Sequence, residues 1–159
     1  MRKSGKLIWN PRLGVSLNAR RQLPAMMRGY FAQVRELLTA NPKPAELHAI
    51  RLATKRVRYT LELFRPCYEA PLEPRIAELQ RLQQILGEVN DCAAAEHVID
   101  GLVAPSLART RAQSFLRRRA AAKATELRRE WRQSFDAPGR EHSWLHYLAS
   151  SARVKEPRL

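Results

Sequence analysis

The sequence is poor in the residues from which disulfide-rich domains and phosphate-handling enzymes are built. Cys67 and Cys92 are its only two cysteines, and they form neither a CxxC pair nor a dense framework. A reducing cytosolic setting is therefore the default. The chain also lacks a glycine-rich phosphate loop and a cluster of acidic residues that would hold catalytic Mg²⁺. These absences predict a protein that is not an enzyme and has no cofactor.

Long apolar runs are missing as well. No segment approaches the ~20 apolar residues that cross a bilayer. The N-terminus is basic but lacks the apolar run of a signal peptide. We therefore expect a soluble, cytoplasmic protein with no membrane partner.

Acidic residues are outnumbered by basic ones. The 159 residues include 29 Lys and Arg against 15 Asp and Glu, which gives a formal net charge of +14 and a pI near 11.0. Such a balance favours polyanionic partners. Most of the cations are arginines, whose planar fork matches phosphate oxygens better than a lysine point charge does. The alternative interpretation is a surface that is basic only for solubility.

Helical periodicity dominates the pattern of apolar residues, and no segment is typical of a strand. Proline and glycine separate the periodic segments. Pro24 suits the first turn of a helix better than its interior, so the first helix has two candidate starts. The predicted helices run from about Ser16 or Pro24 to Ala40, from Ala45 to Phe64, from Pro74 to Leu102 and from Ser106 to Phe135, with a short helix near Glu141 to Ser151.

Four long helices with short connections predict an all-α fold, an antiparallel four-helix bundle with a short extra C-terminal helix. We divide the chain into a basic irregular arm (residues 1–15), the four-helix domain (16–135) and a C-terminal helix and tail (136–159).

The second predicted helix carries a basic stripe. At ~100° per residue, its members and Glu62 fall within an arc of about 80°. Ile50, Val57 and Leu61 lie on the opposite side, which would face the core. The basic stripe consists of His48, Arg51, Lys55 and Arg58. A polyanion of repeating charge fits along such a face.

Two motifs carry a resemblance to a known family. His48-x-x-Arg51-x-x-x-Lys55-Arg56-x-Arg58-Tyr59-x-x-Glu62 is followed by Leu82-Gln83-x-x-Leu86-Gly87-x-x-Asn90-Asp91. In this order, on consecutive helices, they resemble the CHAD domain, the conserved histidine α-helical domain, over roughly residues 17 to 135. The resemblance implies a helical bundle that binds inorganic polyphosphate through basic residues lining a groove, and a location at polyphosphate granules.

A full CHAD domain has two four-helix halves, each with its own basic helix, whereas this chain has one motif set. We therefore identify it as a half-length member. Leu52, Tyr59 and Leu63 form an apolar strip beside the basic stripe, where a lone bundle would leave them wet. A two-fold homodimer would bury this apolar strip and rebuild the groove. The alternative is that the fourth helix or the N-terminal arm covers the apolar strip.

The residues of the second helix have different expected roles. Arg51 and Arg58 are candidates for forked hydrogen bonds to phosphoryl oxygens, and Lys55 for a central point charge. Arg56 would serve the groove edge or the dimer contact. His48 would either donate to phosphate or fix the start of the helix. Tyr59 would either donate its hydroxyl to phosphate or be a partly buried structural residue.

The fourth predicted helix adds candidates to the polyphosphate site. Its arginines spread around the helix, so not all of them can face one groove. Arg111, Arg118 and Arg129 share a face and are the expected additional phosphate contacts. The remaining cations of this helix are interpreted as solvated surface.

Two other functions compete with polyphosphate binding. Sequence-independent binding of DNA or RNA needs the same charge, but single-strand binders interleave exposed aromatics, and only Tyr59 lies near the stripe. His142 and His146 have the i, i+4 spacing of metal ligands, but no acid or cysteine completes a zinc pattern, so no metal site is expected. The ExExK motif of the triphosphatase domains often fused to CHAD is also absent.

Overall fold

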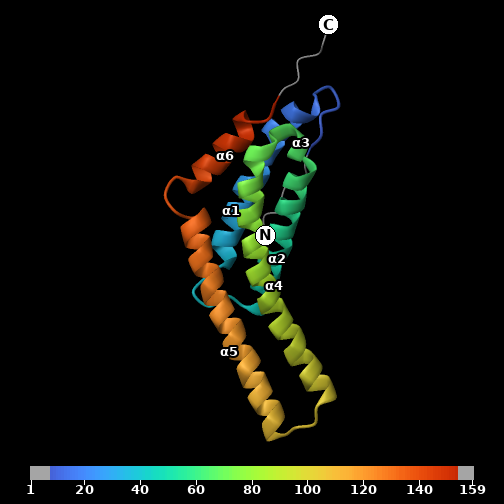
Figure 1. The fold of residues 1–159 in the computed structure, drawn as a ribbon, viewed down its shortest axis with the longest axis vertical. Helices are drawn as coiled ribbons and strands as arrows, with labels where there is room; N and C mark the ends of the chain where they lie inside the picture. Colours follow the sequence, from blue (N-terminus) through green and yellow to red (C-terminus); the bar gives the residue numbers. More distant parts are fainter. Residues whose placement is uncertain (1–7, 154–159) are drawn as a thin grey trace.

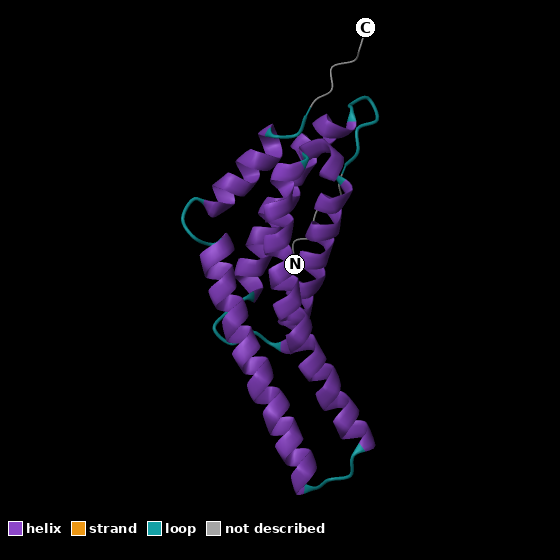
Figure 2. Ribbon diagram, in the orientation of Figure 1, coloured by secondary structure: helices purple, strands orange, loops and turns teal. Residues whose placement is uncertain are grey.

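The computed structural model describes residues 8–153, which form helices joined by short turns and contain no strand (Figures 1 and 2). The expected all-α class is confirmed. The elements are α1 (Val15–Leu37), α2 (Pro44–Leu63), α3 (Arg65–Tyr68), the 3₁₀ turn η1 (Ala70–Leu72), α4 (Glu73–Leu102), α5 (Leu107–Glu130), the π-helical turn η2 (Trp131–Phe135) and α6 (Arg140–Ser150).

The long helices pack as a bundle in which each contacts its neighbours. α1 packs against α2 and α6, and α4 packs against α2 and α5. The core includes a buried face from each of these elements. The C-terminal half of α4 and the N-terminal half of α5 extend past the other helices as a two-helix hairpin (Figure 1). The hairpin leaves large apolar side chains exposed, among them Leu102, Leu107 and Phe115.

The first helix begins at Val15 and continues through Pro24. Asn18, which is 1% exposed, fixes this start. Its Nδ2 donates to the carbonyls of Asn10, Leu13 and Gly14 at 3.0–3.2 Å, and its Oδ1 accepts from the Asn10 amide at 2.9 Å. Because these bonds hold residues 10–14 against the helix, Pro24 lies in its interior rather than in its first turn, as one alternative had it. Residues 1–7 of the expected arm lie outside the described residues.

The second helix begins at Pro44, where the Glu46 carboxylate accepts a 2.6 Å hydrogen bond from the Lys43 amide. Its inner face is fixed by Thr54, which is fully buried. The Thr54 hydroxyl donates to the Ile50 carbonyl at 2.9 Å, so the Tyr30 hydroxyl, 3.0 Å away, donates to Thr54. This buried bond joins α1 to α2 and directs the polar face of α2 outward.

The last helix completes the core. Trp144 and Leu148 of α6 are buried, and the Trp144 ring stacks at 6.0 Å on Phe135. Phe135 stacks in turn at 5.1 Å on Trp131, the first residue of the π turn. The segment predicted as an extra C-terminal helix therefore shares the bundle core up to Ala152, and residues 154–159 of the expected tail lie outside the described residues.

Candidate functional site

The basic stripe lies on the outer face of α2, along its border with α4. His48 is exposed, whereas Arg51 and Lys55 are half-buried. Arg58 reaches α4, where its Nε donates to Gln83 Oε1 at 2.7 Å. A shallow hollow of about 280 Å³ opens there, between Arg58 and the glutamines of α4. Arg58, at one end of the stripe, therefore borders a hollow whose other side is rich in amides. Gln83 belongs to the second motif, but its role as a partner of Arg58 was not predicted.

Most cations of this surface are not neutralised. Within residues 8–153, no carboxylate lies within 4.0 Å of Arg51, Lys55 or Arg56. Glu62 is the acid at the end of the stripe, and it pairs with Arg58 at 2.6 Å. The stripe thus retains net positive charge available to an outside anion.

Arg58 is engaged inside the protein. Its Nη1 bonds Glu62, its Nε bonds Gln83, and its guanidinium carbon lies 4.2 Å from the centroid of the Tyr59 ring. A guanidinium forms a fork with Nη2 and either Nη1 or Nε, and both of those nitrogens have partners here. A forked bond to phosphate would therefore have to share Nη1 with Glu62 or displace Gln83 from Nε. Arg51 has no such engagement, and its Nε is buried without a hydrogen-bond partner among the described residues.

His48 and Tyr59 flank the freer cations. The His48 imidazole makes no hydrogen bond within the part of the chain that the structure describes, and Glu46 rather than His48 fixes the start of α2. Tyr59 is half-exposed, with Lys55 Nζ 5.9 Å from its ring centroid. Its ring therefore makes cation–π contacts with both Lys55 and Arg58.

The apolar strip is exposed. Leu52, Tyr59 and Leu63 are 48%, 46% and 79% exposed. Within residues 8–153 neither the N-terminal segment nor α5 covers them, since Ile8 bonds Gln22 of α1 and α5 packs on α4. The prediction that a lone bundle leaves this apolar strip wet is confirmed.

The arginines of α5 are not brought to the stripe. α5 packs on α4. It approaches α2 at the first turn of α2, where Leu47 lines a cavity of about 320 Å³ with Leu116 and Ala120 of α5. Arg111, Arg118 and Arg129 are exposed on α5, across α4 from the stripe. One bundle therefore places these residues on a different surface from the stripe.

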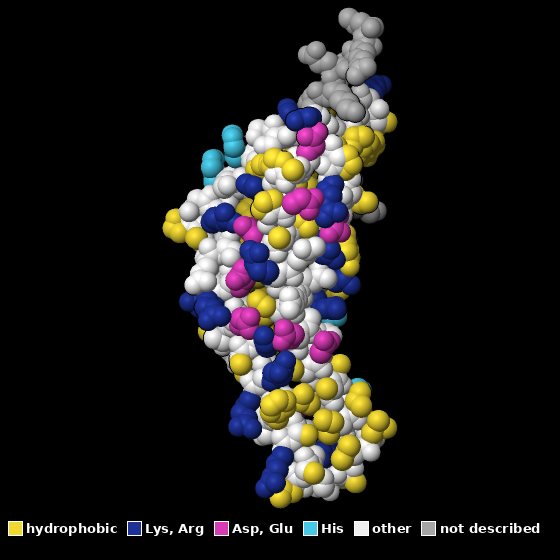
Figure 3. Space-filling view, viewed as in Figure 1, with side chains coloured by type: hydrophobic (Ala, Val, Ile, Leu, Met, Phe, Trp, Pro, Cys, Tyr) yellow, Lys and Arg dark blue, Asp and Glu magenta, His cyan; other side chains and the backbone are white. Residues whose placement is uncertain are grey.

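Several other α5 cations are neutralised by α4. Acidic and basic side chains alternate over the middle of the face seen in Figure 3. Glu88 is within 4.0 Å of Arg119 and Lys123, and Glu96 pairs with Arg117. Hydrogen bonds to Glu126 and Glu88 raise the pKa of Lys123. These paired cations add less net charge to the surface than the unpaired cations of α2 do.

No cluster of three or more His, Cys, Asp or Glu side chains that would hold a metal ion occurs among the described residues. His142 and His146 stack at 6.1 Å on the exposed side of α6. No helix in the described range is long and apolar enough to cross a membrane.

The family model of the CHAD domain matches residues 4–100. The match includes both motifs and ends within α4, whereas the resemblance was expected to extend to about residue 135. Searches of curated proteins and of solved structures find no match. Because the family model covers more than half of the chain, the protein belongs to the CHAD domain family, which is known in polyphosphate-related proteins.

Proposed function

We propose that this protein binds inorganic polyphosphate along the basic stripe of α2 and catalyses no reaction on it. The observation that carries the proposal is the set of cations without carboxylate partners, Arg51, Lys55 and Arg56, on a helix that the core holds in place. Successive stripe residues are about one helical turn, ~5.4 Å, apart. A flexible chain of phosphates can meet each of them in turn.

The basic residues of α2 have different roles in binding polyphosphate. Arg51 offers forked hydrogen bonds, Lys55 a point charge, and Arg56 a contact at the groove edge. Arg58 is held by Gln83 and Glu62, so it sets the shape of the groove and adds charge rather than a free fork.

Sequence-independent nucleic-acid binding is the alternative function. The same charge supports it, since phosphate contacts dominate such binding. Single-strand binders also present aromatic rings on which bases stack. The exposed ring beside the stripe is Tyr59, and Lys55 and Arg58 already lie near it. The site therefore favours a ligand that is phosphate without bases.

We further propose that two copies associate through the apolar strip. A two-fold axis beside α2 would bury Leu52 and Leu63 and bring two basic stripes together as one groove. Leu52→Ser with Leu63→Ser should then give monomers in light scattering, with helicity unchanged in circular dichroism. An unaltered mass for this variant, or a monomeric wild-type protein, would contradict the dimer.

The test of binding is a competition titration. Labelled long-chain polyphosphate is displaced by unlabelled polyphosphate, duplex DNA or single-stranded RNA at physiological salt. Polyphosphate should compete best, and affinity should fall steeply with salt because several counterions are released together. Equal displacement by all three polyanions would show that the charge is generic.

A matched pair of variants locates the site. Arg51→Glu with Lys55→Glu should abolish most binding. Arg21→Glu with Arg28→Glu makes the same charge change at exposed α1 arginines that have no carboxylate partner among the described residues, and it should retain most of the affinity. Similar losses in both variants would remove the stripe from the mechanism. A protein that binds in this way is expected at polyphosphate granules.

A further inference from the structure

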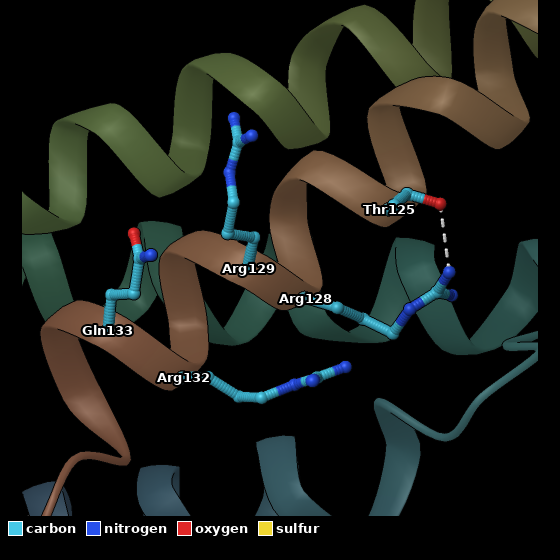
Figure 4. A pocket seen from close by; sticks show the side chains of 5 residues that line it. All are labelled: Thr125, Arg128, Arg129, Arg132 and Gln133. Carbon is cyan, nitrogen blue, oxygen red and sulfur yellow. Dashed lines mark hydrogen bonds between the residues drawn. The ribbon is translucent and has the colours of Figure 1, made fainter.

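A second group of cations without acid partners lies where α5 passes into the π turn. Arg128, Arg129 and Arg132 surround a hollow of about 370 Å³, together with Thr125 and Gln133. We call these five residues the arginine hollow. Arg129 extends toward α4 (Figure 4), yet no α4 carboxylate in the described residues lies within 4.0 Å of it, whereas Glu88 and Glu96 neutralise neighbouring cations of α5.

The side chains of the arginine hollow form two rows. Arg129 and Gln133 extend toward one side of the helix, and Arg128 and Arg132 toward the other (Figure 4). The second row also lines an adjoining hollow of about 400 Å³, whose other wall includes Leu38 and Thr39 at the end of α1. Two guanidinium groups on adjacent turns thus reach the same open space.

Arg128 is held without being neutralised. Its Nη2 donates to Thr125 Oγ1 at 2.9 Å, and the Thr125 hydroxyl donates to the Ala121 carbonyl at 3.1 Å. The threonine therefore orients the guanidinium through a neutral acceptor. An arginine has five N–H donors, so most of those on Arg128 remain for a ligand.

The surrounding acids are occupied elsewhere. No carboxylate in the described residues lies within 4.0 Å of Arg128, Arg129 or Arg132. Asp136 lines the adjoining hollow, but Arg35 of α1 binds it at 2.6 Å. Glu130 of the same helix pairs with Arg81 and accepts from Ser134.

Placing arginines on adjacent turns costs stability, and the packing of the core does not require them there. Like charges four residues apart on a helix repel each other by a few tenths of a kcal/mol. The π turn itself has a core role, because it places the stacked Trp131 and Phe135 inward. That role does not demand arginine at Arg128 and Arg132, whose head groups contact solvent.

We propose that the arginine hollow is a second anion-binding site, distinct from the basic stripe, for a compact anion with two or three phosphoryl groups. Its lining contains donors and no carboxylate, which suits phosphoryl oxygens. Its volume lies near the lower limit of small-molecule sites, ~300–1,000 Å³. The site does not depend on the function proposed for the stripe.

The experiment measures binding of inorganic triphosphate to the full chain by isothermal titration calorimetry. Arg128→Gln with Arg132→Gln should weaken one binding event by tenfold or more. Arg128→Lys with Arg132→Lys keeps the charge but removes the forks, and it should fall between this variant and the wild type. Circular dichroism should show that both variants keep their helicity.

Two reference proteins separate this site from other causes. Arg21→Gln with Arg28→Gln removes the same charge from α1 and should bind triphosphate as the wild type does. Arg51→Glu with Lys55→Glu disables the stripe and should retain the binding event of the arginine hollow. If Arg51→Glu with Lys55→Glu loses triphosphate binding and Arg128→Gln with Arg132→Gln keeps it, this proposal is overturned and the function proposed for the stripe still stands. Equal loss in the α1 variant would also overturn it.

A nucleoside triphosphate distinguishes the source of the phosphates. The lining of the arginine hollow has no aromatic ring, so the nucleotide should bind no more tightly than inorganic triphosphate. A tenfold preference for the nucleotide would overturn phosphoryl groups as the recognised chemistry.

Discussion

Helices α2 and α5 are both rich in arginine, yet they use their charge differently. On α5, Arg117 and Arg119 face carboxylates of α4, which lie 21 and 31 residues away in sequence. On α2, Arg51 and Lys55 face no carboxylate in the described residues, and the α4 side chains beside Arg58 are glutamines. A count of cations therefore does not locate a binding surface. The acids opposite them decide which charges remain for a ligand.

The largest effect should separate these two kinds of cation. Arg51→Ala with Lys55→Ala removes two contacts to a charged ligand, each worth ~1.5–3 kcal/mol, so polyphosphate affinity should fall at least about 100-fold. Arg117→Ala with Arg119→Ala removes the same formal charge from neutralised positions, and affinity should change about twofold. Fluorescence anisotropy with labelled polyphosphate measures both. Equal losses would mean that pairing with α4 does not matter.

Much of this architecture could be predicted from the sequence. Apolar periodicity located the long helices to within a few residues, and the stripe follows from helical geometry alone. The pairing of α5 with α4 could not be predicted, because it depends on the register of two helices joined by a hairpin. For the same reason the sequence does not show how near Arg111, Arg118 and Arg129 lie to the stripe, and in one bundle α4 lies between the two surfaces.

The interior of α1 and the role of α6 also escaped prediction. Pro24 signalled a helix start, but the Asn18 bonds to residues 10–14 are tertiary contacts that no local propensity shows. Trp144 is a strong core signal on a short helix, yet its partner Phe135 is set by the π turn. Such a turn has no signature in the periodicity.

A buried hydrogen bond fixes α2 to α1, whereas Thr125 of the exposed α5 surface makes no such link. Thr54→Val leaves the buried Tyr30 hydroxyl without an acceptor, which costs about 1–3 kcal/mol. Urea denaturation should show this loss in the free energy of unfolding. Thr125→Val, at an exposed position of α5, should change it much less. A stable Thr54→Val protein would show that the buried bond does not hold the stripe in place.

Alkaline pH should lower the stability of the bundle core. Burial raises the pKa of Tyr30 and of Tyr68, whose hydroxyl donates to the Leu148 carbonyl at 2.6 Å. A tyrosine whose pKa is raised in the folded state stabilises fully below its unfolded pKa of ~10, and this contribution is lost as the pH rises above that value. Unfolding free energy should therefore decline above about pH 10. Tyr68→Phe should reduce the slope, and a slope unchanged in that variant would assign the decline to other groups.

The smallest effect should come from converting a neutralised cation of α5 into a free one. Glu96→Gln removes the carboxylate that Arg117 binds, and Arg117 is largely exposed. Exposed ion pairs contribute ~0–1 kcal/mol, so the melting temperature should barely move. Polyphosphate affinity at low salt should rise, because Arg117 would join the charges available to a ligand, and the gain should vanish as salt screens it. The matched change Glu73→Gln, which frees Arg65 at the far end of the bundle, alters the net charge equally. If both variants gain the same affinity, net charge alone controls binding. If Glu96→Gln gains more, the anion passes near α5, and the hairpin extends the surface that α2 begins.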